Sequence, residues 1–202
     1  MRVKSFLVSF LVSFLFVSQI PAETVTLKTY PATQTDSEGR TENREFSILY
    51  NTDENELNFW FVEDFGAWST RYWFEVGRYG RKKIGKILAK AEEWAVAAKS
   101  ENLTIEKEFP FNEFTGDISR NELKVTDYGR TDICFYFVAK AGEPFIKMRF
   151  KPSGIFKQIK PPAQTMTLED FRDMSEFLNA PNFKDILNAQ KAEAKRKNDI
   201  LK

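Results

Sequence analysis

Alternating apolar and polar residues predict a meander of strands in the first half of the chain. From residue 45, the segment EFSILY alternates, ELNFWFVE is apolar on both faces, and WSTRYWFEV alternates again. In the third segment Tyr72 and Phe74 share one face, whereas Arg71 and Glu75 share the other. Short polar turns separate the three segments, so we expect neighbouring strands to pair antiparallel.

The periodicity becomes that of a helix over residues 81–99. Apolar residues recur there every three or four positions, while Lys86, Lys90 and Glu93 fall on the opposite face. The segment ENLTIEKEFPF that follows is predicted to be a further strand. Residues 113–121 are predicted to form a turn.

The second half of the chain repeats this order of elements. The segment ELKVTDYGRTDICFYFVAK is predicted to form two strands around an Asp-Tyr-Gly-Arg turn, and PFIKMRF a third. Residues 153–165 form a predicted loop with two adjacent prolines. Thr167 starts a helix through the capping-box pattern TLED. The segment APN ends this helix, and Asn182 caps a last charged helix or tail over residues 182–202.

These elements predict an α+β fold of antiparallel meander sheets, each followed by a helix, with a C-terminal helix. The two halves suggest a duplicated βββα unit, with repeats at 45–101 and 120–180. One shift along the chain places Phe59 on Phe135 and Phe74 on Phe150. Because the chain has 20 phenylalanines, chance matches are the alternative. Repeated meander-and-helix units resemble, at fold level, several unrelated groups that bind nucleic acid or proteins, so fold alone does not decide function.

The beginning of the chain has the pattern of an export signal. Arg2 and Lys4 precede an apolar run, and Ala22 is a suitable last residue before cleavage. An uncleaved anchor is the alternative, but the run is short for the roughly 30 Å of a bilayer core. We therefore expect residues 1–22 to be a cleaved signal peptide and the protein to be periplasmic or secreted.

The exported chain is expected to hold a single α+β domain over residues 45–181. The polar segment 23–44 before it is predicted to be mainly a linker, with one candidate strand at 24–30. The full chain has 30 basic and 29 acidic residues. Loss of Arg2 and Lys4 would leave 28 basic residues, so the exported chain would be close to neutral. No global field would then draw the protein to nucleic acid or to an anionic membrane.

The eight residues GRKKIGKI, at positions 80–87, are close to a phosphate-binding P-loop. The position after Lys86 is Ile87, whereas a P-loop needs a hydroxyl there to ligate Mg²⁺. Ile87 also fits the apolar stripe of the predicted helix. The preceding strand alternates, unlike the buried parallel strand that leads into a P-loop. We therefore predict no nucleotide.

A basic cluster nevertheless lies at the start of that helix, where positive charge is mildly unfavourable because of the helix dipole. Its members are Arg78, Arg81, Lys82, Lys83 and Lys86. One interpretation is a solvated surface with no ligand. The other is an anion-binding site, formed by the cations and the free N–H groups of the helix start. Tyr72, Trp73 and Tyr79 are candidates for stacking on sugars or bases, or for the core.

Catalytic chemistry has little support in the sequence. There is no histidine, which removes the commonest general base and the commonest metal ligand. Cys134, the only cysteine, lies in an apolar strand and is expected to be a buried thiol. Sequence neighbours such as Glu63 and Asp64 point apart on a strand, and Asp170 is accounted for by capping. We therefore predict no catalytic residue, no metal and no cofactor.

The leading functional prediction is an exported, non-catalytic binding protein whose partner is a protein in the envelope or outside the cell. The alternative is a polyanion-binding module centred on the basic helix start, with a phospholipid, an acidic glycan or nucleic acid as ligand. A hydrolase that uses carboxylates such as Glu63 with Asp64, or Glu169 with Asp170, is a third hypothesis.

Overall fold

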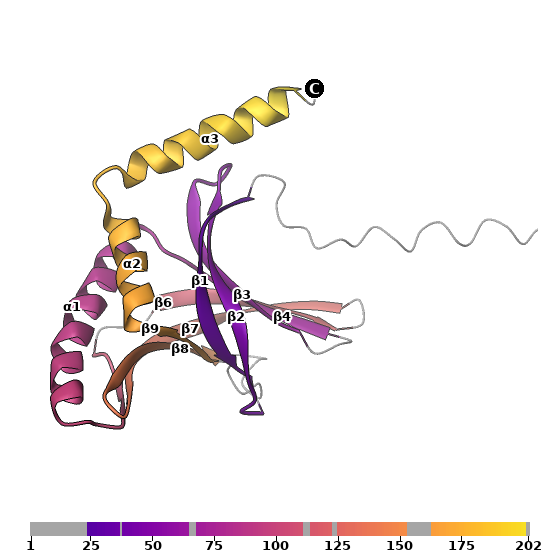
Figure 1. Cartoon of the computed structure of the whole chain (residues 1–202). Helices are drawn as coiled ribbons and strands as arrows, with labels where there is room; N and C mark the ends of the chain where they lie inside the picture. The colour runs from indigo at the N-terminus through magenta and orange to yellow at the C-terminus, as the bar shows by residue number, and fades with distance from the viewer. Residues whose placement is uncertain are drawn as a thin grey trace, which may run out of the picture.

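The structure is a computed structural model, in which residues 24–36, 38–64, 68–110, 114–122, 125–152 and 163–200 are described (Figure 1). The elements are β1 (Thr24–Thr35), β2 (Thr41–Asn51), β3 (Glu56–Asp64), β4 (Trp68–Glu75), α1 (Arg78–Ser100), β5 (Ile105–Glu108), β6 (Phe114–Glu122), β7 (Val125–Lys140), β8 (Glu143–Pro152), β9 (Ala163–Thr167), α2 (Leu168–Asn179) and α3 (Phe183–Ile200). The predicted signal peptide and the prolines of the predicted loop lie outside the described residues. The α+β class is as predicted.

The described strands form one antiparallel sheet that curls until it closes on itself. Their order is β5-β7-β6-β4-β3-β2-β1-β9-β8, and β8 also pairs with β7. One edge of β7 therefore carries β6 and then β5, while the other edge carries β8. The curl of the long strands is visible in Figure 1. Closure leaves few free strand edges in the described part of the chain.

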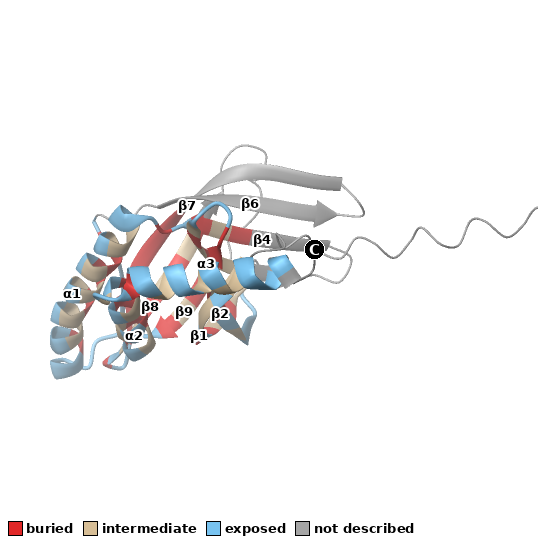
Figure 2. Cartoon of the chain, turned by 90° about the horizontal axis from the view of Figure 1, so that it is seen from above, coloured by how far each residue is buried: buried red, intermediate tan, exposed pale blue. Residues whose placement is uncertain are grey.

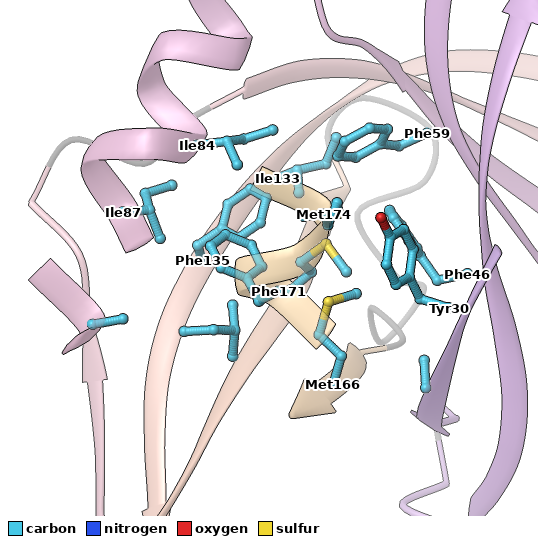
Figure 3. Close-up of a cluster of buried hydrophobic side chains, with 14 of the residues drawn as sticks. Tyr30, Phe46, Phe59, Ile84, Ile87, Ile133, Phe135, Met166, Phe171 and Met174 are labelled. Atoms are coloured by element: carbon cyan, nitrogen blue, oxygen red, sulfur yellow. The ribbon is translucent and has the colours of Figure 1, made fainter. Parts of the chain in front are cut away.

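Alternation along the strands sends one set of side chains to a shared core, and we call this side of the sheet its inner face. The core joins the inner face to α1 and α2 in a single cluster of buried residues. Figure 3 shows Phe171 and Met174 of α2 lying between Ile133 and Phe135 of β7 on one side and Tyr30 of β1 on the other. The rings of Phe135 and Phe171 meet edge to face, with centroids 6.0 Å apart. Helix side chains thus fill the concave side of the sheet.

The two core helices are held together at their surfaces as well. The Arg172 Nε atom of α2 donates to the Glu92 Oε1 atom of α1 over 2.8 Å. The last helix, α3, starts at Phe183, next to the predicted cap Asn182, and extends away from the sheet with most of its surface exposed (Figures 1 and 2). It remains helical to Ile200. None of the described helices combines the length and apolar character needed to cross a membrane.

The candidate strand at 24–30 is present as the first part of β1, but the described residues between 31 and 44 do not form the predicted linker. Residues 24–35 form β1, and residues from Thr41 belong to β2. The β1 and β2 strands pair along almost their whole length, and β1 also pairs with β9 at Thr33–Thr35. The segment is rich in threonine, a β-branched residue that suits a half-exposed strand. Its longest ladder is with the next strand, β2, so backbone pairing makes it a strand although its composition is polar.

Two predicted turns are also strands. Residues 113–121 were expected to turn, but β6 covers Phe114–Glu122. The Asp-Tyr-Gly-Arg sequence was expected to divide two strands, but it lies within the continuous strand β7. The two errors have one cause, because each segment supplies the other's hydrogen bonds, with Ile118 opposite Gly129. Pairing along nine positions outweighs the local preference of glycine for a turn.

The residues that the proposed duplication aligns do not occupy equivalent positions in the strand ladders. In the described part of the chain four strands precede α1, whereas five, β5–β9, lie between α1 and α2, so the two halves do not contain the same set of strands. The sequence shift aligns β3 with β7. Moreover, Phe59 pairs with Phe74, whereas Phe135 pairs with Met148 rather than with Phe150. The aligned phenylalanines therefore do not hold equivalent positions, and a duplication stays a hypothesis.

We expect Thr167→Ala to lower the free energy of unfolding by roughly 1 kcal/mol. The Thr167 Oγ1 atom caps α2 by accepting from the Asp170 N–H over 3.0 Å, as the capping-box pattern predicted. Urea denaturation of the purified protein measures the change. Thr167→Ser keeps the hydroxyl and is the control, since it should retain most of the stability. Equal losses in the two variants would show that the cap does not hold this helix.

Candidate binding surfaces

The predicted basic cluster divides into an exposed stripe and an anchored residue. Arg78, Lys82 and Lys86 follow one another at intervals of four along α1 and are all exposed. Residues at this spacing lie on one face of a helix. The first turn of α1 contains no acid, and Gly77 gives the helix no side-chain cap. Figure 2 shows the outer side of α1 exposed. We call these three residues the basic stripe.

Arg81 has a structural role instead. Its Nη1 atom donates to the carbonyl oxygen of Leu178 over 3.0 Å, at the C-terminal end of α2. Its guanidinium carbon lies 4.8 Å from the ring centroid of Phe183, which begins α3. Burial, with a smaller contribution from Arg78, lowers the pKa of the Arg81 guanidinium. A cation at a helix C-terminus interacts favourably with the carbonyls there. Arg81 therefore joins α1, α2 and α3 and is not part of the stripe.

The other members of the predicted site also separate. Lys83 is only partly exposed and has an interaction of its own. Tyr72 is fully buried in the core. Tyr79 is 87% exposed beside the basic stripe, so its ring is accessible to a ligand. Trp73 is neither in the core nor beside the stripe, because it points to the opposite side of the sheet.

Trp73 forms a stacked pair with Trp60 on the outer face of the sheet. The two residues are directly opposite each other in the β3–β4 ladder, with ring centroids 5.9 Å apart and ring planes 23° from parallel. Both side chains are partly exposed, whereas Phe59 and Phe74 next to them are buried on the inner face. On β2 the position opposite Trp60 is Ser47, which has a small side chain.

Acidic and amide side chains continue this surface along β3 and β4. Asn58 is opposite Glu75 in the ladder, and Glu56 precedes Asn58 on the same face of β3. Burial raises the pKa of the Glu56 carboxyl, and the nearby charges of Glu54 and Glu75 raise it further. These carboxylates therefore repel one another in the folded protein. We call the surface formed by Ser47, Glu56, Asn58, Trp60, Trp73 and Glu75 the Trp60–Trp73 face.

A groove of about 410 Å³ lies on another part of the outer face, where β1, β2, β8 and β9 meet. Threonines supply much of its floor, including Thr33, Thr35 and Thr165. Lys140 at its rim lies 5.7 Å from the ring centroid of Phe145. The Arg44 Nη2 atom at the other end is 2.8 Å from the Glu42 Oε1 atom, so that cation is already paired. Hydroxyl groups and satisfied charges suit a small polar ligand better than catalysis.

The groups considered for catalysis lie apart or serve the fold. Cys134 is fully buried, as expected from its apolar strand. The Asp170 Oδ2 atom accepts a hydrogen bond from the Thr167 hydroxyl over 2.6 Å, which fits its predicted role in capping. The side chains of Glu63 and Asp64 lie outside the described residues. Among the described residues, no three potential metal ligands of the His, Cys, Asp and Glu types come together.

One further charged cluster ties β1 to α2. Lys28 forms an ion pair with Asp173, which lowers the pKa of that carboxyl. The Lys28 Nζ atom also lies 5.3 Å from the ring centroid of Phe177. Burial, with the adjacent carboxylate of Asp173, raises the pKa of the Tyr30 hydroxyl well above its usual range. These contacts hold the helix against the sheet, so the cluster is structural.

Sequence reasoning missed the pairing of Trp60 with Trp73. The alternation of RYWFE did place Trp73 opposite the core face, and β3 was noted as apolar on both faces. Two tryptophans at outward positions of consecutive strands therefore indicated an aromatic outer face. The register that places them opposite each other could not be predicted, because it depends on the length of the turn between the strands.

Comparison with known proteins gives no functional assignment. No family model, no curated protein and no solved structure matches this chain.

We expect Arg81→Ala and Lys82→Ala to differ sharply in stability, although the two cations are adjacent. Arg81→Ala removes a charged hydrogen bond and a cation–π contact, so the free energy of unfolding should fall by roughly 1–3 kcal/mol. Lys82→Ala removes an exposed side chain and should change it by less than about 0.5 kcal/mol. Urea denaturation compares the two. A similar loss for both variants would contradict the division of the cluster.

Proposed function

We propose that this is an exported, non-catalytic binding protein that contacts a protein partner through the Trp60–Trp73 face. The observation that carries the proposal is the stacked, partly exposed indole pair on the outer side of the sheet. Tryptophan is enriched at the centres of protein interfaces, because it buries a large apolar area and loses little conformational freedom. A chain that needed these rings only for stability would gain more from placing them in the core.

The arrangement of the sheet supports this assignment of faces. The core helices pack against β7, β8 and β9 and join the cluster of inner-face residues. The inner face of β3 contributes Phe59, which meets Phe74 at a ring-centroid distance of 4.9 Å. The indole pair lies on the other side of the same strands. The packed inner face thus fixes the backbone that presents Trp60 and Trp73, and a rigid support reduces the entropic cost of binding.

We expect Trp60→Thr with Trp73→Thr to abolish capture of a partner. The purified protein, immobilised, is exposed to the envelope and medium fractions of the organism that makes it. Wild type should retain one partner in stoichiometric amount, and the double variant should retain at least about tenfold less, since truncated hot-spot residues typically cost 2 kcal/mol or more. Threonine keeps the β propensity of the strands.

The matched control for this experiment is Lys82→Ala with Lys86→Ala, on the exposed side of α1. This variant should capture the partner as wild type does. Unfolding midpoints of all three proteins establish that each is folded. Equal capture by wild type and the tryptophan variant would overturn the assignment of the binding surface.

A second candidate function, binding of a polyanion, is favoured by the basic stripe. Among the described residues no ion pair is formed by Arg78, Lys82 or Lys86, whereas Lys90, one turn further along, has its Nζ atom 2.7 Å from the Glu93 Oε1 atom. The exposed ring of Tyr79 lies within reach of the same helix face. Cations together with a stacking ring suit a nucleic acid or an acidic glycan.

We expect heparin to bind the protein at low salt and to lose affinity steeply as salt rises, if this second function holds. Lys82→Ala with Lys86→Ala should remove most of the binding, whereas the tryptophan variant should not. Titration by calorimetry at two salt concentrations measures both effects. Equal binding by the lysine variant would leave the stripe as a solvated surface.

A further inference from the structure

We propose that the occupant of the Trp60–Trp73 face is a positively charged, arginine-bearing segment of the partner protein, an inference that rests on the proposed function. The face combines an aromatic surface with carboxylates on neighbouring positions. Glu75 follows Trp73 by two residues on the outer side of β4, which is a separation of about 7 Å along a strand. Glu56 lies on the outer side of β3, with Asn58 between it and Trp60.

The charge of this face is left uncompensated by the described part of the chain. No described lysine or arginine forms an ion pair with Glu56 or Glu75, although Glu42, Glu92, Glu93 and Glu106 each have such a partner. The charges that raise the pKa of Glu56 are those of Glu54 and Glu75, which have the same sign and lie close to it. A cationic partner would relieve this repulsion, and an anionic one would increase it.

The protein itself shows how such a face accepts arginine. On the outer side of β7 and β8, the guanidinium carbon of Arg149 lies 5.0 Å from the ring centroid of Tyr136. The Arg149 Nη2 atom donates to the Glu106 Oε1 atom over 3.0 Å. One arginine thus contacts an aromatic ring and a carboxylate together. The Trp60–Trp73 face offers the same two groups, arranged on adjacent strands.

Arginine fits these groups better than lysine or a neutral ligand. Its planar guanidinium stacks on an indole while its N–H groups donate to a carboxylate in two parallel bonds. Cation–π contacts are strongest with tryptophan. A neutral saccharide would also stack on an indole, but its hydroxyls would not offset the repulsion between Glu56 and Glu75. Charge complementarity therefore selects a basic polypeptide.

The test uses three peptides of equal length in which serine alternates with arginine, with citrulline or with glutamate. Citrulline has nearly the shape of arginine and no charge. Fluorescence anisotropy measures binding to wild type, to Trp60→Thr with Trp73→Thr, and to Glu56→Gln with Glu75→Gln. We expect the arginine peptide to bind wild type saturably. Each double variant should bind the arginine peptide at least tenfold more weakly than wild type does. Wild type should bind the citrulline peptide at least tenfold more weakly than the arginine peptide.

The glutamine variant separates a binding role from a structural one. Removal of like charges should leave its unfolding midpoint unchanged or higher, so weaker binding cannot come from unfolding. Equal affinity for the arginine and citrulline peptides, undiminished binding by the glutamine variant, or no binding by wild type would overturn the inference.

Failure of this inference is distinguishable from failure of the proposed function. If the captured partner is lost with the tryptophan variant but retained by the glutamine variant, the face binds a protein and the basic occupant is wrong. If neither variant changes capture of the partner, the proposed function is wrong as well.

Discussion

The structure depends on one constraint, which is that a sheet closed on itself must have a filled concave side. Side chains of α2 supply much of that filling, with Phe171 and Met174 fully buried against the strands. Closure and filling require each other: without the helices the inner face would be exposed to water, and without closure several strands would be left with unpaired edges. The concave side is therefore filled by the core, and the outer face and the helix surfaces are what the fold leaves accessible.

Closure is completed at a short seam. The β1–β9 ladder joins only the positions Thr33–Thr35 to Ala163–Thr165. Within this seam Gln34 and Gln164 are opposite each other and buried, and the Gln164 Nε2 atom donates to the Gln34 Oε1 atom over 3.3 Å. The Gln164 Oε1 atom has no hydrogen-bond partner among the described residues, so the pair is only partly satisfied. A slip of either strand by one residue would turn its amide to the outer face and break this bond, so the pair favours the observed register of β1 and β9.

Local pattern was enough to predict the elements that have a regular apolar face or a recognisable cap. The alternation around Tyr72 and Phe74, the apolar stripe of α1 and the cap at Thr167 all appear in the structure as expected. The segments that failed, residues 31–35 of β1, β6 and the first half of β7, are polar, and each is made a strand by pairing with the other strand of a hairpin and not by a hydrophobic pattern. In the same way the basic cluster was visible in the sequence, but the anchoring of Arg81 at the end of α2 was not, because Leu178 is far along the chain.

Two kinds of charged residue can be distinguished in the described part of the chain: those that hold elements together and those that form no ion pair. Arg81 and Arg149 are charges whose contacts with a carbonyl, a ring or a carboxylate hold elements together. The basic stripe lies at a helix start and Glu56 lies beside like charges, so each costs some stability in the isolated fold. Such costs are small, and a nearly neutral chain tolerates them. They nevertheless fall on two surfaces of opposite sign, one on the outer side of α1 and one on the outer face of the sheet. Each surface is therefore complementary in charge to a different class of ligand, and the two candidate functions can be tested separately.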